Sequence, residues 1–172
     1  QYDAGDKGIY RHYMQKEIYE QPKTINDTIS PRIKDNDIVI EELNMSDEEI
    51  QEITKIHIVA CGSAYHTGVT AKYVIEGLAR IPVEVDVASE FRYRDPILQK
   101  GNMVIVISQS GETLDTMAAL REAKKRGARI LSIVNVVGSS IAAESDDVLY
   151  TWAGPEISVA TTKAYSTQLV ML

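Results

Sequence analysis

Residues 103–116 read MVIVISQSGETLDT, and this stretch decides the fold. Five apolar residues are followed at once by hydroxyl, amide and glycine residues, which is typical of a strand buried on both faces that ends in a tight turn. We expect a strand over residues 103–107 and a helix over residues 112–126, with Gly127 just past its end. Free N–H groups and the dipole at such a helix N-terminus favour an anion, so the turn outlines a phosphate site.

Short apolar runs and helical segments alternate along most of the chain. We also expect strands over residues 55–60, 83–87, 129–134 and 148–151, helices over 65–79, 139–145 and 159–172, and a polar turn or short helix over 89–94. Because crossovers between parallel strands are right-handed, this order predicts the α/β class: a three-layer αβα sandwich with a five-stranded, mostly parallel sheet. Ligands of such sheets bind at the carboxyl ends of the strands, where the polar turns 61–66, 89–94, 108–113 and 135–140 fall.

Residues 1–45 lack this alternation, and we interpret them as a helical lead-in. Residues 6–20 have helical spacing, and we expect Pro22 to stop that helix. Residues 23–44 are polar, which predicts a second short helix and then a loop, with residues 38–40 extended.

A capping box marks the start of the globular part. Ser46, with Glu49 three residues later, opens a short helix that we expect to run through Ile53. We therefore place a domain over residues 46–172, after the lead-in over residues 1–45. The chain starts at a glutamine and stops within a helical pattern, so we expect part of a longer polypeptide whose last helix is truncated.

Composition and charge exclude several kinds of partner. The 172 residues are 44% hydrophobic and 25% charged, and their formal net charge of −7 argues against a nucleic acid or an anionic membrane surface as partner. One phosphate remains compatible with this charge, because backbone dipoles can hold it. Cys61 is the single cysteine, which excludes an internal disulfide and fits a cytoplasmic setting. No apolar run approaches the ~20 residues of a membrane span.

The turn at residues 108–113 could simply cap the following helix, as a serine at Ser110 often does. Three features favour phosphate binding instead: three hydroxyls where one would cap, the position at a strand's carboxyl end, and Gly111, which admits a ligand close to the backbone. The turn contains no lysine or arginine, so it is not the GxxxxGK[ST] nucleotide loop. We expect a monophosphate held by neutral donors.

A second strand-to-helix turn reads CGSAYHTG over residues 61–68 and does not match the GxSxG nucleophile motif. Cys61 fits a small buried residue better than a nucleophile, and His66 fits a structural role. Ser63 lies at the tip of the turn and is the better candidate for a ligand contact.

The remaining candidates have plainer explanations. Glu90 and Arg92 fit a solvated, capped helix start, with an interface role left open, and Lys163 fits an exposed lysine better than an amine catalyst. His12 and His57 lack metal-like partners in the sequence, so we expect no metal and no cofactor.

Taken together, the stretches ACGSAYHTG, ASEFRYRDP, ISQSGETLDT, NVVGSSIAAESD and EISVATTKAYSTQL resemble a known family. They are similar to the first sugar isomerase (SIS) module of the isomerising glutamine–fructose-6-phosphate aminotransferases, also called glucosamine-6-phosphate synthases. YMQKEIYEQP at residues 13–22 is similar to that family's segment between its glutaminase domain and its isomerase half. The resemblance covers essentially the whole chain.

The resemblance implies a sugar-phosphate site. The substrate-binding residues that it implies are Ser63, Ser108, Gln109, Ser110, Thr113, Val159 and Thr161. Family members commonly carry a hydroxyl residue where this chain has Ala64, so one sugar contact is absent. Because Ser63 keeps its hydroxyl, we expect fructose 6-phosphate or glucosamine 6-phosphate still to bind.

The resemblance also implies that chemistry needs parts outside this chain. Family members convert fructose 6-phosphate and glutamine to glucosamine 6-phosphate and glutamate, with isomerisation groups in a second SIS module and a C-terminal tail. We therefore expect no catalytic residue here, and we interpret Glu112 as compensating a helix dipole. The expected partners are the second module, a glutaminase domain and further copies of the protein.

Two alternatives stay open. The first is another SIS protein, either a phosphosugar isomerase or a regulator that senses a sugar phosphate. The second is a nucleotide-binding α/β domain, which predicts a GxGxxG turn after its first strand, and CGSAYHTG does not supply one.

Overall fold

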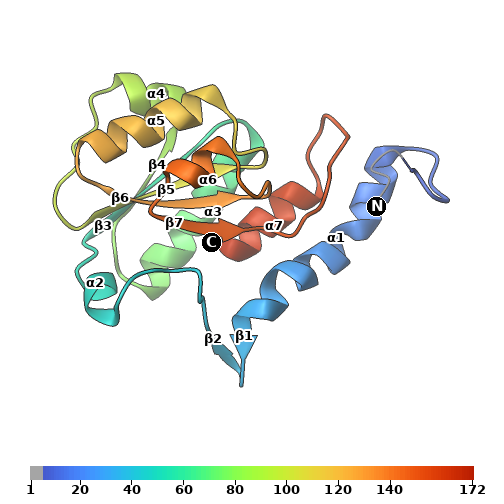
Figure 1. Ribbon diagram of the computed structural model, residues 1–172, viewed down its shortest axis with the longest axis horizontal. Helices are drawn as coiled ribbons and strands as arrows, with labels where there is room; N and C mark the ends of the chain where they lie inside the picture. The colour runs from blue at the N-terminus through green and yellow to red at the C-terminus, as the bar shows by residue number, and fades with distance from the viewer. Residues whose placement is uncertain (1–5) are drawn as a thin grey trace.

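The computed structural model describes residues 6–172. Its centre is a five-stranded sheet in the order β4-β3-β5-β6-β7 (Figure 1). All neighbouring strands in this sheet run parallel, which confirms the predicted α/β fold and brings the carboxyl ends to one edge. The strands are β3 Lys55–Ala60, β4 Val83–Val87, β5 Asn102–Ser108, β6 Arg129–Val134 and β7 Asp147–Tyr150.

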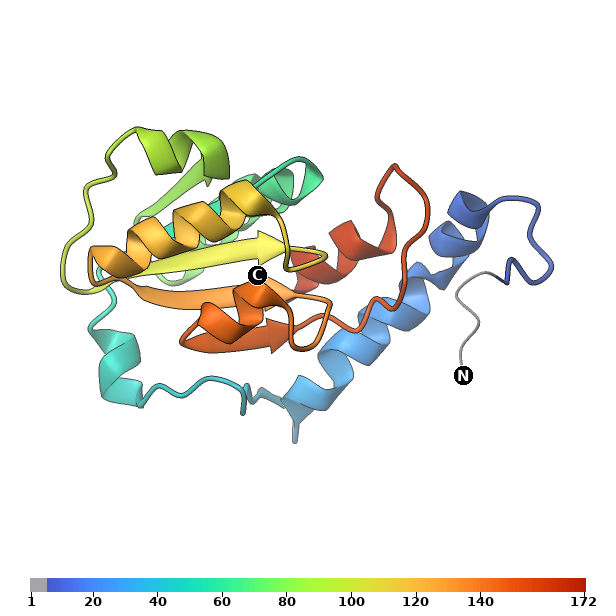
Figure 2. The same ribbon diagram turned by 45° about the horizontal axis from the view of Figure 1, so that its top comes forward.

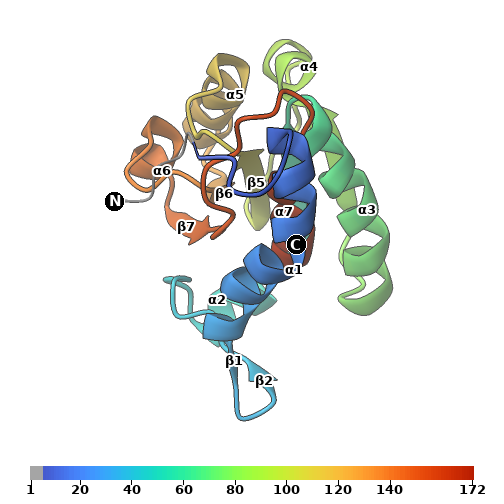
Figure 3. The same ribbon diagram turned by 90° about the vertical axis from the view of Figure 1, so that its right-hand side faces the viewer.

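Helices cover both faces of the sheet and complete the three layers (Figures 2 and 3). One face carries α4 Ala88–Tyr93, α5 Leu114–Lys125 and α6 Ser140–Glu144, and the other carries α3 Ser63–Leu78 and α7 Lys163–Met171. Each face has its own apolar core between the sheet and its helices. No helix within residues 6–172 combines the length and the apolar composition needed to cross a membrane.

The central strand β5 supplies both cores. Val104 and Val106 enter the core under α4, α5 and α6, whereas Met103, Ile105 and Ile107 enter the core on the α3 side. All seven residues of β5 are buried, which explains why its sequence is a continuous apolar run without polar alternation. Full burial of each such side chain contributes about 1.5–3 kcal/mol relative to exposure.

The lead-in helix α1 spans Tyr13–Ile29 and contradicts the expected stop at Pro22. It begins at Tyr13 instead of residue 6 and continues through the proline. Proline has no N–H for the carbonyl of Ile18, and the side chain of Gln21 donates from Nε2 to that carbonyl at 3.2 Å. The missing backbone hydrogen bond is replaced locally, so the helix does not end there.

The chain between α1 and the sheet is irregular. It contains the 3₁₀ turn η1 Ser30–Arg32, the two-stranded hairpin β1 Ile33–Lys34 and β2 Asp37–Ile38, and the short helix α2 Asp47–Gln51. The second short helix expected within residues 23–44 is therefore the end of α1 followed by η1. The capping box is confirmed, because Ser46 N–H donates to Glu49 Oε2 at 2.8 Å and Glu49 N–H donates to Ser46 Oγ at 3.3 Å.

Several helix boundaries differ from the prediction. α2 ends at Gln51 instead of Ile53, α5 begins at Leu114 instead of residue 112, and α7 begins at Lys163 instead of residue 159. In the last two cases the preceding residues are held in turns by side-chain hydrogen bonds, which compete with helical backbone pairing.

Candidate functional site

A pocket of about 280 Å³ lies at the carboxyl ends of β3 and β5. Six of the seven predicted substrate-binding residues line it: Ser63, Ser108, Gln109, Ser110, Thr113 and Thr161. Val159 does not line the pocket and lies fully exposed on the preceding loop. The other lining residues are Cys61, Ala64, Ile107, Glu156, Ala164 and Gln168. The turns that follow β3 and β5 and the start of α7 thus meet in one hollow.

Hydroxyl groups shape the turn after β5. Ser108 Oγ accepts from Gly111 N–H at 3.1 Å and lies 3.0 Å from Thr113 Oγ1, with which it hydrogen-bonds. Ser110 Oγ accepts from Glu112 N–H at 3.2 Å. Thr113 is the N-cap of α5, but its side chain accepts no capping hydrogen bond. The first-turn N–H groups of α5 are therefore left without a side-chain cap, as an anion site requires.

Gly111 and Glu112 connect this turn to α6 through hydrogen bonds. Gly111 has φ +68°, and a Cβ there would lie 2.1 Å from Ser139 Oγ, so only glycine fits. Ile141 N–H donates to Gly111 O at 3.0 Å, and Ser140 N–H donates to Glu112 Oε1 at 2.7 Å. Hydrogen bonds from Ser140 hold the pKa of Glu112 below its ordinary value. Glu112 therefore stabilises the start of α6 instead of acting on a ligand.

Gln109 lines the pocket and carries a buried acceptor atom that is unpaired within residues 6–172. Its Oε1 atom is buried without a hydrogen-bond partner among the described residues. A buried acceptor of this kind costs free energy unless something donates to it.

The third wall of the pocket comes from residues around the start of α7. Glu156 Oε1 accepts from Thr161 Oγ1 at 2.8 Å, and Glu156 Oε2 accepts from the N–H groups of Thr162 at 3.1 Å and Ala164 at 3.0 Å. Glu156 thus caps α7 from seven residues before the helix and places Thr161. The sequence prediction missed Glu156 and Gln168, because this spacing is not that of a local cap.

No lysine, arginine or histidine of the described chain lines this pocket, and Glu156 is its single carboxylate. Both oxygens of Glu156 already accept hydrogen bonds. The arrangement therefore suits an anion held by hydroxyl and backbone N–H donors, as the sequence predicted for the turn.

The turn after β3 forms the opposite wall. Gly62 has φ +58° and leads directly into α3, whose first residue, Ser63, is exposed to the pocket. Cys61 is half-buried, and its Sγ accepts from Thr116 Oγ1 at 3.6 Å. This contact agrees with the structural role expected for Cys61.

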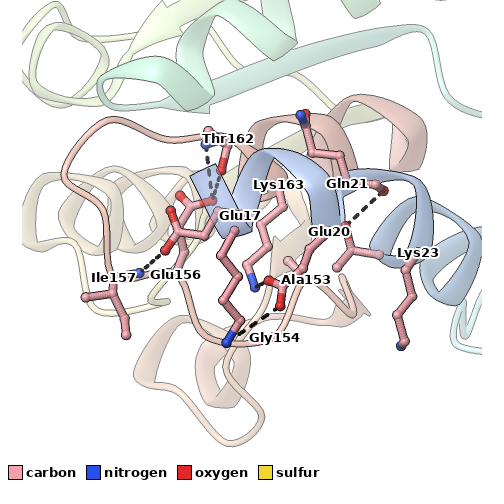
Figure 4. Close-up of polar contacts among 12 residues, drawn as sticks. Glu17, Glu20, Gln21, Lys23, Ala153, Gly154, Glu156, Ile157, Thr162 and Lys163 are labelled. Carbon is pink, nitrogen blue, oxygen red and sulfur yellow. Dashed lines mark hydrogen bonds and ion pairs between the residues drawn. The ribbon is translucent and has the colours of Figure 1, made fainter. Parts of the chain in front are cut away.

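Lys163 differs from the prediction of an exposed side chain. It is only 5% exposed, and its Nζ lies 2.6 Å from Glu20 Oε2 of α1 (Figure 4). The sequence could not reveal this burial, because the covering helix lies more than a hundred positions upstream. A second hollow of about 430 Å³ lies beside this ion pair between α1 and residues 152–155, and it contains none of the predicted site residues.

His57 lies beside two carboxylates, Glu84 and Asp86, that the sequence did not bring together with it. The parallel register pairs it with Glu84 on β4, and ligand atoms of His57, Glu84 and Asp86 all lie within 4.8 Å of one another. All four carboxylate oxygens, however, already accept from Lys55 or Arg94. A metal ion would have to displace both cations, so the cluster is an ion-pair network. Burial, followed by the charge of Lys55, lowers the pKa of His57 and favours its neutral form.

The segment 89–94 forms the short helix α4. Its N-cap is Val87, and no side chain caps it, so the expected capped helix start is wrong. Glu90 is exposed, and Arg92 stacks over the ring of Tyr93 at 4.9 Å. Neither lines the candidate pocket.

The family match and the sequence relatives of this chain agree with each other. The SIS domain family matches residues 49–172. The glutamine–fructose-6-phosphate aminotransferase [isomerizing] of Clostridium tetani is 63% identical over 171 residues, which is 99% of this chain and 28% of that protein. The chain thus spans less than a third of the length of this relative.

Solved structures agree with the sequence relatives. The C-terminal domain of glucosamine-fructose-6-phosphate aminotransferase from Francisella tularensis has a TM-score of 0.91 and 46% identity, and the match covers 96% of this chain and 46% of that chain. The tagatose-6-phosphate ketose/aldose isomerase of Escherichia coli has a TM-score of 0.78 at 15% identity, covering 92% of this chain and 46% of that chain. The second likeness concerns the fold alone.

Proposed function

Because the chain belongs to the SIS domain family, we propose that it is the phosphosugar-binding module of an isomerising glutamine–fructose-6-phosphate aminotransferase. In the whole enzyme, fructose 6-phosphate and glutamine would yield glucosamine 6-phosphate and glutamate. The observation that carries this proposal is the pocket at the carboxyl ends of β3 and β5, which is lined by uncharged hydrogen-bond donors. It occurs in a chain that is 63% identical to an aminotransferase.

The pocket residues divide into two proposed roles. Ser108, Ser110 and Thr113, together with the first-turn N–H groups of α5, would hold the phosphate. Ser63, Gln109 and Thr161 would hydrogen-bond the sugar. We assign Val159 no direct contact through its side chain, because that side chain is fully exposed and does not line the pocket.

The isomerisation step would need groups that this chain does not bring to the pocket. Proton transfer between C1 and C2 requires an acid or base within hydrogen-bond reach. Glu156 is the one carboxylate among the lining residues, and its oxygens are already used to cap α7. A second SIS module would supply the catalytic groups, and a glutaminase domain would supply ammonia. No cofactor or metal is needed for this role.

Exposed apolar side chains support association with a second module or a further copy of the protein. On α3, Leu78 is 83% exposed and Tyr73 is 72% exposed, and Val74 beside them is also exposed. Such side chains on one helix commonly mark an interaction surface. We place the assembled enzyme in the cytoplasm, in keeping with the free thiol of Cys61.

A different phosphosugar isomerase or a sugar-phosphate-sensing regulator is the alternative. The 63% identity to an aminotransferase against 15% identity to the tagatose-6-phosphate isomerase favours the synthase.

Calorimetric titration tests the proposal. Fructose 6-phosphate and glucosamine 6-phosphate should bind the chain, whereas fructose without its phosphate should bind at least tenfold more weakly, because charge-assisted hydrogen bonds are worth about 1.5–3 kcal/mol each. Equal binding of fructose and fructose 6-phosphate would overturn the assignment of a phosphate site.

A further inference from the structure

The buried face of α1 is polar. Its three buried residues are Glu17, Thr24 and Thr28, and its apolar residues Ile18 and Tyr19 are exposed. A helix that packs through polar side chains needs a specific hydrogen-bond partner for each of them, because unpaired buried polar groups are costly. The hydrogen-bond partners of these side chains therefore indicate the structural role of α1.

The segment that runs from the end of β7 into α7 supplies the partners of Glu17 (Figure 4) and Thr28. Thr24 Oγ1 instead donates to Gln21 O at 3.1 Å within α1. Glu17 Oε1 accepts from Ile157 N–H at 2.6 Å and from Ser158 N–H at 3.1 Å. Trp152 N–H donates to Thr28 Oγ1 at 3.1 Å. Together with the Lys163–Glu20 ion pair, these contacts hold residues 152–163 against α1.

Glu17 is ionised where it accepts hydrogen bonds from the loop residues Ile157 and Ser158. The residue is 2% exposed, and its Oε2 has no partner among the described residues. Burial alone would raise the pKa of Glu17, but hydrogen bonds from Ser158 and Ile157 and the charge of Lys163 outweigh it, so the pKa lies below its ordinary value. Two backbone N–H groups on one carboxylate fix the loop at that point.

The fixed loop directly adjoins the pocket wall. Glu156 precedes the two residues held by Glu17, and its carboxylate accepts from Thr161 Oγ1 at 2.8 Å. Glu156 and Thr161 both line the pocket, whereas Glu17 does not. Val159 and residue 160 between these anchors are exposed, so the loop is held by Glu17 on one side and by the contacts of Glu156 with the start of α7 on the other.

We propose that Glu17 is a positioning residue of the sugar-phosphate pocket. Its carboxylate fixes the backbone of residues 157 and 158, and through them the place of Glu156 and Thr161 in the pocket wall. The inference rests on the proposed function, because it assumes that this pocket binds the sugar phosphate. It also gives the lead-in a role in ligand binding, in addition to its role as a connection.

Three variants of the chain test the proposal by calorimetric titration with fructose 6-phosphate. Glu17→Ala removes the carboxylate, and Glu17→Gln keeps one acceptor oxygen in the same place. Glu49→Ala is the matched control, because Glu49 also accepts from a backbone N–H but lies at the opposite end of the sheet. We expect Kd to rise about tenfold in Glu17→Ala, less in Glu17→Gln, and not at all in Glu49→Ala.

The titration separates positioning from stability. A purely structural role would lower the fraction of chain that binds and leave the Kd of the folded fraction unchanged. If Glu17→Ala does not fold, Glu17→Gln decides. A wild-type Kd in every folded Glu17 variant would overturn the proposal.

A second readout keeps the proposal testable if the wild-type chain binds no sugar phosphate, which would refute the proposed function alone. In ¹⁵N NMR spectra, Glu17→Gln should shift the amide resonances of Ile157, Ser158 and Thr161, and Glu49→Ala should leave them in place. An unmoved Thr161 resonance would show that Glu17 does not position the wall.

Discussion

At the scale of single residues, Gly111 is the position on which the phosphate turn depends most. It combines φ +68° with a neighbour, Ser139, that leaves no room for a Cβ. We predict that Gly111→Ala loses about 1–2 kcal/mol through backbone strain and a further 1–3 kcal/mol through overpacking. Urea unfolding of the variant measures the sum, and its affinity for fructose 6-phosphate should fall with it.

Gly127→Ala is the control for this prediction. Gly127 has φ +80°, but a Cβ there would meet nothing within 4 Å, so only the strain should remain. Equal losses of stability in the two variants would show that contact with Ser139 is unimportant.

Residue by residue, the sequence located most of the pocket but not its third wall. Six predicted residues share one hollow because strand ends of a parallel sheet meet at one edge. Their binding role stays a prediction. Glu156 was missed because it caps α7 over a non-local spacing, and Gln168 because it lies within α7. Val159 is exposed instead of lining the pocket. Lys163 was misjudged because a distant helix covers it.

At the scale of elements, the strands were predicted better than the helices. β3, β4 and β6 have the expected bounds, because short apolar runs between polar turns have few other places to be buried. Helix ends depend on side-chain hydrogen bonds that a local pattern does not show, and α1 passes through Pro22 with the help of Gln21. The packing of α1 against the loop before α7 was not foreseen either.

The connection between β6, β7 and the lead-in depends on Asp147, which is buried. Its Oδ2 accepts from Arg129 Nε at 2.7 Å and its Oδ1 accepts from Asn44 N–H at 2.8 Å. Burial opposes the charged form, but these hydrogen bonds outweigh it and hold the pKa of Asp147 below its ordinary value. This contribution to stability is therefore complete above the unfolded pKa of about 4 and is lost as the pH falls through the folded pKa.

We predict that the free energy of unfolding falls as the pH drops below about 4, and that Asp147→Asn removes part of this fall. The variant should also lose about 1–3 kcal/mol at pH 7, because the hydrogen bonds of Arg129 and Asn44 to a buried carboxylate are weakened. Urea unfolding followed by Trp152 fluorescence between pH 3 and pH 7 measures both effects. Asp37→Asn in the exposed hairpin is the control, and the prediction is wrong if both variants follow the wild-type pH dependence.

At the scale of the whole molecule, the candidate pocket has no free carboxylate, lysine or histidine among its described lining residues. Both oxygens of Glu156, the pocket's carboxylate, cap α7. We therefore predict that the chain alone forms no glucosamine 6-phosphate from fructose 6-phosphate, whether glutamine or ammonia is added. Product assays over hours at micromolar protein provide the test, and turnover abolished by Glu156→Gln would contradict the assignment of catalysis to other modules.

We propose that the turn after β5 holds the phosphate of a sugar phosphate. To test this assignment, we would measure the Kd of fructose 6-phosphate for the wild-type chain, for Ser110→Ala and for Ser145→Ala, which loses a hydroxyl that directly follows α6 and donates to Ile141 O. Loss of a hydrogen bond to a charged group should weaken binding to Ser110→Ala by about 1–3 kcal/mol and leave Ser145→Ala unchanged. Unchanged affinity in Ser110→Ala would contradict the claim.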